Sequence, residues 1–365
     1  MGSLRRALCC GLLVLLVSSC GSGADDGSNA NDKPLVGVIL PDRDASRWEE
    51  QDRPLLTQAL TFAGMNPVVE NAEGDEKKFA SLADDLIARK VKVLMITPLT
   101  PESGATVERK AKAAGIPVID YDRISLGGVA DYYVSFDNLN IGELQAEGLL
   151  KCLGTKPAAQ IIEIQGSPTD NNATLFADGQ RRKLGPLYDS GKLKLVQSQA
   201  VDKWDPVLGK AAFQRILEDN GGRVDGVVAA DDALAGAVIE VLQDKGLAGR
   251  VPVTGQNASL SALRAILLGD QCMTVHKPIR DEAEAAARLA VLVAKGDTSG
   301  ADDLATGNTR DLVGRRDVKS VLLGADLIAK EDVRGLLVTE NDLKPAELCA
   351  GEVASVCAEL GIVVN

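Results

Sequence analysis

The fold is decided by residues 91–121, VKVLMITPLTPESGATVERKAKAAGIPVIDY. The apolar run from Val91 to Thr97 predicts a buried parallel strand, and the run from Ile116 to Tyr121 predicts the next strand. Between them, a helix is expected to end at Gly115. Upstream, the pattern repeats with a strand at 35–40, a helix from about 48 to 64, a strand at 67–70 and a helix near 75–90. Such repeats of about 25–30 residues are typical of a doubly wound α/β sheet.

The same alternation restarts after residues 132–138. A helix is expected from about 141 to 153 and another from about 280 to 295. Strands are predicted at 160–165, 193–196, 224–229, 251–254 and 273–275, with a last candidate at 321–323. The polar stretch 296–303 reads as a surface loop. Two such sets in one chain predict two parallel sheets, and therefore two similar lobes.

Composition and charge exclude several classes of function. The chain has 365 residues with a formal net charge of −12, and an acidic protein is a poor partner for a nucleic-acid backbone. It contains one histidine, His276, so any His-based metal site, Ser-His pair or Cys-His pair would depend on that residue alone. The composition therefore disfavours His-based metal sites and Ser-His or Cys-His catalysis; we expect no metal and no cofactor, and the resemblance described below implies no enzyme activity.

The first twenty residues predict export. Two arginines, Arg5 and Arg6, precede an apolar run from Leu8 to Val17, which is too short to cross a bilayer core of about 30 Å. The ending Val-Ser-Ser-Cys20 resembles a bacterial lipobox. We therefore expect a signal peptide over 1–19, lipidation of Cys20 and a small, polar tether over 20–33. The alternative is an ordinary signal peptide in which Cys20 is incidental.

Four cysteines remain after Cys9, Cys10 and Cys20 are set aside. An even number of cysteines in an exported protein favours disulfides. Two of the four are close in sequence, which suggests a disulfide within the C-terminal tail, and the remaining two would then form the second pair. Free buried thiols are the alternative. The expected pairs are Cys349 with Cys357 and Cys152 with Cys272.

Polar side chains follow many of the predicted strands. In open α/β sheets, ligands bind beyond the carboxyl ends of the strands. Carboxylate, amide and guanidinium groups can serve the hydroxyls of a sugar, and a tryptophan face suits the C–H side of its ring. The pattern indicates a carbohydrate ligand. The strand-end residues include Asp42, Arg43, Arg47, Asp122, Arg123, Asp170, Asn171, Asn172, Trp204, Asp231, Asp232, Gln256, Asn257 and Lys277.

These stretches resemble the type I periplasmic sugar-binding proteins of ABC importers, and among them the xylose-binding members. The resemblance covers about 35–294 and is carried by SRW (46–48), YDR (121–123), YVSFDN (133–138), GELQ (142–145), GSPTDNNA (166–173), VDKW (201–204), GQNA (255–258) and TVHKP (274–278). It implies two lobes joined by a three-segment hinge: residues 34–137 with 277–325, and residues 138–276 with 326–365. It also implies sugar contacts from Arg47, Asp122, Arg123, Asp170, Asn172, Trp204, Asp231, Asn257 and Lys277.

Two positions depart from the family pattern. Xylose binders usually have Asn-Asp where this chain has Asp231-Asp232, and Gly-Gln-Asp-Ala where it has GQNA. This exchange of amide and carboxylate leaves another pentose, a hexose or a polyol open as ligand. Asp232 is expected to cap the following helix. Other interpretations remain open: a surface ion pair for Asp122 and Arg123, packing for Trp204 and a hinge role alone for Lys277. Trp48 is expected to pack rather than bind.

The resemblance implies capture of a monosaccharide by hinge closure and its delivery to a membrane permease with its ATPase. One alternative is a sensor that presents its sugar to a membrane receptor kinase. A glycoside hydrolase using Asp231 and Asp232 is a weaker alternative, because residues adjacent in sequence rarely face the same bond. The expected location is the outer face of the cytoplasmic membrane, held by lipid alone, or the periplasm.

Overall fold

The computed structural model describes residues 33–43, 47–339 and 343–364. The compact unit runs from Pro34 to Asn365 and contains every element described below. The expected signal peptide (1–19), Cys20 and most of the tether (20–33) lie outside the described residues. Within the described ranges, no helix combines the length and apolar character needed to span a bilayer.

The first half of this unit is built on a seven-stranded sheet in the order β10-β11-β5-β4-β3-β1-β2. All neighbours are parallel except β10 and β11, which form an antiparallel hairpin. The strands are β1 (Leu35–Leu40), β2 (Asn66–Asn71), β3 (Val93–Ile96), β4 (Val118–Tyr121), β5 (Tyr132–Phe136), β10 (Gly307–Asp311) and β11 (Arg316–Leu323).

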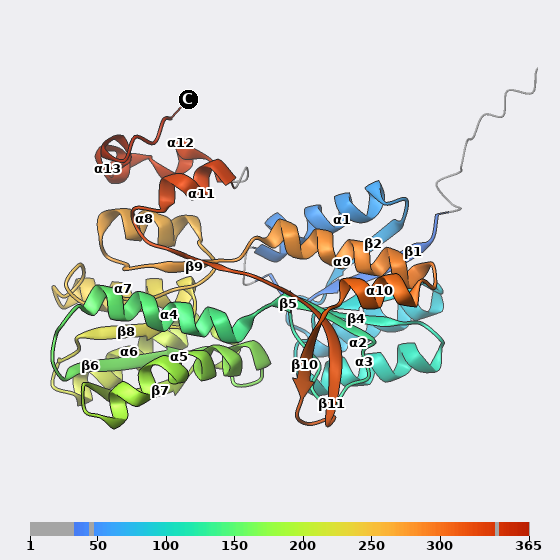
Figure 1. The fold of residues 1–365 in the computed structure, drawn as a ribbon, viewed down its shortest axis with the longest axis horizontal. Helices are drawn as coiled ribbons and strands as arrows, with labels where there is room; N and C mark the ends of the chain where they lie inside the picture. Colours follow the sequence, from blue (N-terminus) through green and yellow to red (C-terminus); the bar gives the residue numbers. More distant parts are fainter. Residues whose placement is uncertain (1–32, 44–46, 340–342, 365) are drawn as a thin grey trace, which may run out of the picture. The chain divides into compact units, whose positions relative to one another are not determined.

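Helices cover both faces of this sheet (Figure 1). Alternation along β1 explains why: Val36, Val38 and Leu40 pack with α1 and α9, whereas Ile39 packs with α2 and α3. The helices are the π-helical turn η2 (Trp48–Asp52), α1 (Arg53–Phe62), α2 (Glu76–Ala88), α3 (Pro101–Ala113), α9 (Ile279–Ala294) and α10 (Thr298–Leu304).

The second half contains a three-stranded parallel sheet in the order β7-β6-β8 and an antiparallel pair, β9 with β12. These strands are β6 (Ala159–Gln165), β7 (Leu193–Ala200), β8 (Gly226–Ala229), β9 (Thr274–His276) and β12 (Asp326–Ile328). Its helices include α4 (Asn138–Leu153), α5 (Asn171–Asp189), η3 (Asp202–Trp204), α6 (Pro206–Asp219), α7 (Asp232–Asp244) and α8 (Leu260–Leu268).

The chain passes three times between the two halves, after β5, after β9 and after β11. This topology confirms the predicted α/β fold, in which two parallel-sheet halves are joined by three segments. Two local predictions were wrong. Residues 251–254 form a single bridge, Val227 to Val253, rather than a strand. The polar stretch 296–303 contains α10, because Asp297 caps the helix by accepting from the amide of Gly300 and Ala301 is buried.

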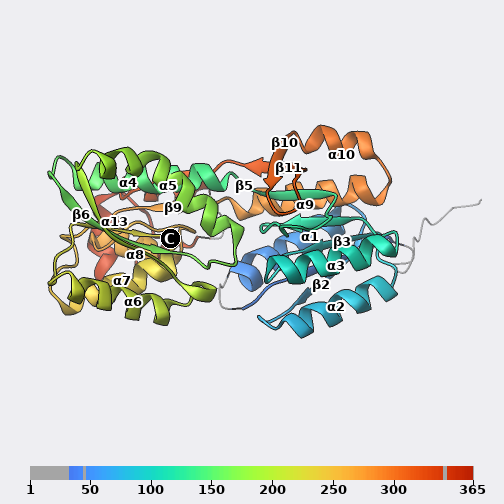
Figure 2. The same ribbon diagram turned by 90° about the horizontal axis from the view of Figure 1, so that it is seen from below.

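A C-terminal segment begins with β12 and packs on α8 in both views of the ribbon (Figures 1 and 2). After β12 it contains α11 (Val333–Thr339), α12 (Pro345–Leu348), η4 (Gly351–Val353) and α13 (Ala354–Glu359). Cys349 and Cys357 are joined by a disulfide within it. A second disulfide joins Cys152, at the end of α4, to Cys272, just before β9.

Candidate functional site

Asp122 lies at the carboxyl end of β4 with a left-handed backbone, φ 62°. This conformation is uncommon for a residue other than glycine. It directs the carbonyl oxygen of Asp122 to three donors: the hydroxyl of Tyr133 at 2.9 Å, the hydroxyl of Ser135 at 2.8 Å and the amide of Asn172 at 2.9 Å. These bonds hold the turn, and they leave the Asp122 carboxylate facing a group of charged side chains.

Arg47 is the hub of that group and is only 9% exposed. Its guanidinium donates to both oxygens of Asp52 at 2.8 and 2.9 Å, to Asp122 at 2.8 Å and to Glu282 at 3.0 Å. An arginine has five N–H groups, so these four bonds leave one for a ligand. Arg47 therefore acts mainly on the orientation of Asp122, with at most one direct hydrogen bond to a sugar in this arrangement.

Lys277 supplies the second positive charge beside Asp122. Its Nζ lies 3.8 Å from the Asp122 carboxylate and 5.4 Å from the centre of the Phe136 ring. Burial alone would raise the pKa of Asp122, but the charges of Arg47, Lys277 and Arg123 bring this pKa below its ordinary value. Burial, followed by the charge of Arg47, lowers the pKa of Lys277. Asp122 is thus a charged acceptor.

Arg123 and Asp170 join the two halves directly. The Nε of Arg123, after β4, lies 3.2 Å from Oδ2 of Asp170, which precedes α5. The other oxygen of Asp170 caps α5 by accepting from the backbone amide of Asn172 at 2.9 Å. The Asn172 side chain in turn accepts from the amide of Asn138 at 2.9 Å and donates to Asp122. Four of the predicted contact residues thus form one bonded network across the halves.

Trp204 lies at the edge of the same network. Its indole N–H donates to Asp170 at 3.2 Å, and its ring meets Phe176 edge-on, with 6.3 Å between centroids. Gly166 makes room for the indole, because a Cβ at residue 166 would collide with the ring. The indole is held in one orientation and remains partly exposed. That arrangement can present an aromatic face to a ligand.

Asp231 and Asn257 stand apart from this network. Among the described residues, no hydrogen bond or ion pair links either of them to the Arg47, Asp122 and Asp170 group. Asp231 caps α7 by accepting from the amide of Leu234 at 2.8 Å, so the expectation that Asp232 is the cap was wrong. Burial raises the pKa of Asp231 to about 7. The charge of Lys277 acts on this carboxyl, which relates Asp231 electrostatically to the rest of the site.

Asp232 points the other way and holds the neighbouring loop. Its carboxylate accepts from the backbone amide of Ser259 at 2.8 Å, from Thr274 at 2.8 Å and from Gln271 at 3.0 Å. These three hydrogen bonds tie Asp232 to the structure around β9 and α8. The adjacent pair Asp231-Asp232 has two separate tasks, which argues against their acting together on one bond.

The sequence interpretation missed several members of the site. Asp52 accepts from the hydroxyl of Tyr121 at 2.6 Å as well as from Arg47, and Glu282 lies fully buried on α9. Trp48 is 2% exposed, with the Arg47 guanidinium 4.3 Å and the Arg123 guanidinium 5.6 Å from its ring centre. Among the described residues, its indole N–H has no hydrogen-bond partner. Glu282 could have been recognised from the sequence, because it is an acidic residue on the otherwise apolar face of a predicted helix.

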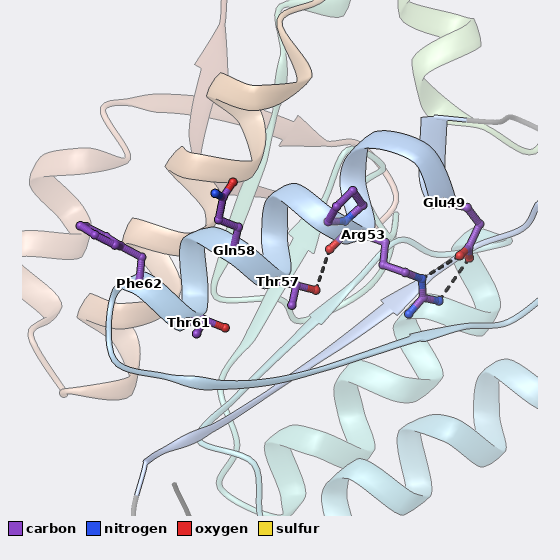
Figure 3. Close-up of a pocket in the computed structure, with 7 residues that line it drawn as sticks. Glu49, Arg53, Thr57, Gln58, Thr61 and Phe62 are labelled. Carbon is purple, nitrogen blue, oxygen red and sulfur yellow. Dashed lines mark hydrogen bonds and ion pairs between the residues drawn. The ribbon is translucent and has the colours of Figure 1, made fainter. Parts of the chain in front are cut away.

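An open hollow of about 830 Å³ lies elsewhere, on the surface of α1 (Figure 3). It contains none of the predicted contact residues. Its lining is Glu49, Arg53, Pro54, Thr57, Gln58, Thr61 and Phe62. Regarding metals, the described part of the chain has no group of three or more His, Cys, Asp and Glu side chains arranged to hold an ion.

Comparison with known proteins identifies the family. Residues 36–298 match the periplasmic binding protein domain. The chain is 36% identical to the D-xylose-binding periplasmic protein of Escherichia coli, over 86% of this chain and 92% of that protein. It is 31% identical to a multiple sugar-binding periplasmic receptor of Rhizobium radiobacter, over 87% and 93% of the two chains.

A solved structure shows the same fold. It is a carbohydrate transporter solute-binding protein from Chloroflexus aurantiacus, in complex with D-glucose, with a TM-score of 0.79 and 26% identity over 86% of this chain and 97% of that one. Both the sequence relatives and this structure cover nearly the whole of the compact unit. The chain therefore belongs to the periplasmic binding proteins, and within them to the type I sugar-binding family.

Proposed function

We propose that this protein is the substrate-binding component of an ABC sugar importer, which captures a monosaccharide, D-xylose or a similar pentose, and delivers it to the permease and its ATPase. The observation that carries the proposal is the network between the halves: Arg123 with Asp170, and Asp122 with Asn172. Polar residues from the strand ends of both halves meet there, as ligand binding in α/β folds requires.

The chemistry of these residues suits a small molecule covered with hydroxyls. Asp122 and Asp170 can accept from hydroxyls, and Arg123 and Lys277 can donate to them. Asn172 and Asn257 can do both, and Trp204 offers a partly exposed ring for the C–H face of a sugar. Each hydrogen bond to a charged group contributes about 1.5–3 kcal/mol, so a few of them suffice for micromolar affinity, near −8 kcal/mol.

Hinge closure is the proposed mechanism. The three segments after β5, β9 and β11 let the two halves move as bodies, and Lys277 lies directly on the second segment. We take residues 34–137 with 277–325 as one lobe and residues 138–276 with 326–365 as the other. A sugar that contacts both lobes binds the closed form better than the open one and shifts the population toward it. A permease that recognises the closed form would then receive loaded protein selectively.

The identity of the sugar depends on Asp231 and Asn257. Relatives are named for D-xylose, for multiple sugars, for D-apiose and for ribose. The exchange of carboxylate and amide at residues 231 and 257 changes where hydroxyls can donate and accept. D-xylose is the first ligand to test, followed by other pentoses, hexoses and polyols.

Anchoring to a membrane is part of the proposal. The basic residues, the apolar run and the Val-Ser-Ser-Cys20 ending support cleavage before Cys20 and its lipidation. Two or more acyl chains hold a protein stably at a bilayer, whereas one does not. Incorporation of labelled fatty acid into the wild type and its loss in Cys20→Ala would test this; unlabelled wild-type protein would refute the anchor.

A second role is supported by one relative, which is named a receptor rather than an import protein. In that role the loaded protein would present its sugar to a membrane sensor kinase. The site and the closure would be the same, and only the partner would differ. Uptake of labelled sugar that disappears on deletion of the gene favours import; unchanged uptake with a lost transcriptional response favours sensing.

Isothermal titration tests the binding function directly. The soluble chain from residue 21 onward contains the whole compact unit and can be titrated with D-xylose and then with the wider panel. Saturable binding of one monosaccharide at one site per chain is expected. Absence of binding to every sugar and polyol in the panel would refute the proposed function.

A further inference from the structure

The C-terminal segment, described over residues 326–339 and 343–364, lies beyond the matched domain 36–298 and contains none of the proposed sugar contacts. It nevertheless shares a hydrophobic core with α8, beside which α13 lies in both ribbon views (Figures 1 and 2). The buried members of this core are Ala258, Leu263, Ile266 and Leu267 from the α8 region, and Ile328, Val333, Leu336, Leu348, Cys349, Val353, Cys357 and Ile362 from the segment.

Polar contacts fix the segment to α8 as well. The guanidinium of Arg264, on α8, donates to the backbone carbonyls of Glu347 at 3.1 Å, Leu348 at 3.2 Å and Ala350 at 2.8 Å. These carbonyls flank Cys349, whose disulfide with Cys357 closes η4 and the start of α13 into a loop. Arg264 therefore binds the segment through backbone carbonyls on both sides of Cys349, where the disulfide loop begins.

The turn that leads into α8 carries Asn257, a proposed sugar contact. Asn257 has φ 106° and Ala258 has φ 50°, so two consecutive residues other than glycine are left-handed. Each such residue costs about 1–3 kcal/mol and persists only where its surroundings impose the conformation. Ala258 is 5% exposed and belongs to the core shared with the C-terminal segment.

The segment also supports the strand on the other side of this turn. The backbone amide of Asn257 donates to the carbonyl of Val275 at 2.8 Å, and the backbone amide of Ala258 donates to the hydroxyl of Thr274 at 3.2 Å. Both acceptors lie on β9, where β12 of the segment pairs antiparallel with it, Leu327 opposite Val275 and Ile328 opposite Thr274. The turn is thus held between two elements, α8 and β9, that the segment covers.

We propose that the disulfide-closed C-terminal segment is a positioning element for the sugar site. It holds the Asn257–Ala258 turn in its left-handed conformation and so orients the side-chain amide of Asn257 toward the ligand. The inference rests on the proposed sugar-binding function. In it, Arg264, Cys349 and Cys357 act through Asn257 and do not touch the sugar. Without the segment, the turn relaxes to a less costly backbone and the amide moves away.

The test compares sugar affinity in variants of the soluble chain at a temperature where all are folded. The double variant Cys349→Ser with Cys357→Ser opens the disulfide loop. The variant Arg264→Met removes the hydrogen bonds from α8 to the segment and leaves the disulfide in place. Each is expected to raise the Kd by about tenfold, the effect of one misplaced hydrogen-bonding group. Phe79→Leu is the control: it destabilises the buried core under α2, away from α8, and is expected to lower the melting temperature without changing the Kd.

A cycle with Asn257→Ala separates positioning from general stability. Because the segment acts through Asn257, opening the loop in the Asn257→Ala background should cost no further affinity. An unchanged Kd in both segment variants, or a full additional loss in that background, would overturn the inference while leaving the sugar-binding function intact. If the wild-type chain binds no sugar, the proposed function fails and this inference fails with it.

Discussion

The guanidinium of Arg123 and the carboxylate of Asp170 approach to 3.2 Å, although one follows β4 in the first half and the other precedes α5 in the second. Asp170 also caps α5 and accepts from the indole of Trp204. One carboxylate thereby fixes a helix start, an aromatic ring and an arginine from the opposite half. A ligand bound beside this pair would contact both halves at once.

Replacing Arg123 with alanine is expected to weaken sugar binding at least about tenfold. The change removes a donor to the ligand and the ion pair that favours the closed form. Melting of the ligand-free protein should change little, because without Arg123 the carboxylate of Asp170 still accepts from the backbone amide of Asn172 and from the indole of Trp204. Arg109→Ala is the matched control, since Arg109 is exposed on α3. Equal affinity in the two variants would place the site elsewhere.

Gly166→Ala is expected to displace the indole of Trp204, because the added methyl group would occupy the space of the ring. Sugar affinity should fall to about that of Trp204→Ala, with a loss of about tenfold or more. Gly236 in α7 offers the control: apart from its chain neighbours and the backbone of its own helix, a Cβ there meets no described atom within 4 Å. Gly236→Ala should bind normally and be slightly more stable, because alanine favours helix. Calorimetry on the three variants decides whether the ring contacts the sugar.

Asp231 should make stability depend on pH. Burial raises its pKa to about 7 in the folded protein, whereas the ordinary value is near 3.9. The folded state then holds its proton more tightly, so this stabilising contribution is complete below about pH 4 and is lost as the pH rises through 7. Relative to Asp231→Asn, the wild type should lose about 2 kcal/mol of unfolding free energy between pH 5.5 and pH 8.

Urea unfolding of both proteins at several pH values measures this difference. The other buried acids of the site are present in both proteins, so the comparison isolates the carboxyl of Asp231 together with its interaction with Asp232. A constant difference between wild type and Asp231→Asn across this range would show that the carboxyl titrates at its ordinary pKa. In that case Asp231 would be charged throughout and available only as an acceptor.

The double variant Asp231→Asn with Asn257→Asp restores the pattern usual among xylose binders. If the exchange determines which hydroxyl of the sugar hydrogen-bonds at each position, the preference of the double variant for D-xylose over the other sugars of the panel should exceed that of the wild type by about tenfold or more. Each single variant should bind every sugar of the panel poorly, because one leaves two carboxylates and the other leaves two amides. Unchanged preference in the double variant, measured by competition calorimetry, would show that the selectivity lies in other residues.

The fold could be predicted from the sequence because its buried parallel strands are short, continuous apolar runs, such as the one from Val93 to Ile96. The hairpin strand β10, which reads Gly-Asn-Thr-Arg-Asp, has no such run and was missed. The α10 helix was missed for a related reason: its seven residues, of which six are polar or small, show no strong periodicity, and the helix depends on its Asp297 cap.

The candidate site was predictable where its residues follow strands, as Asp122 and Arg123 do. Asp52 and Glu282 were missed because they lie within helical segments, and only the tertiary structure brings them to Arg47. The choice between Asp231 and Asp232 as helix cap depended on a one-residue difference in the start of α7, which propensity alone does not resolve. Trp48 was assigned to packing, and its buried ring does pack, but both arginines of the site lie over it.

The crystal structure of the soluble chain with the tightest-binding sugar of the panel tests the central claim most directly. We predict that the sugar lies between the two halves, with hydrogen bonds to Asp122 or Arg123 on one side and to Asp170, Asn172 or Asp231 on the other, and with its C–H face on Trp204. A sugar that contacts residues of one half only, or that occupies the hollow on α1, would contradict the account.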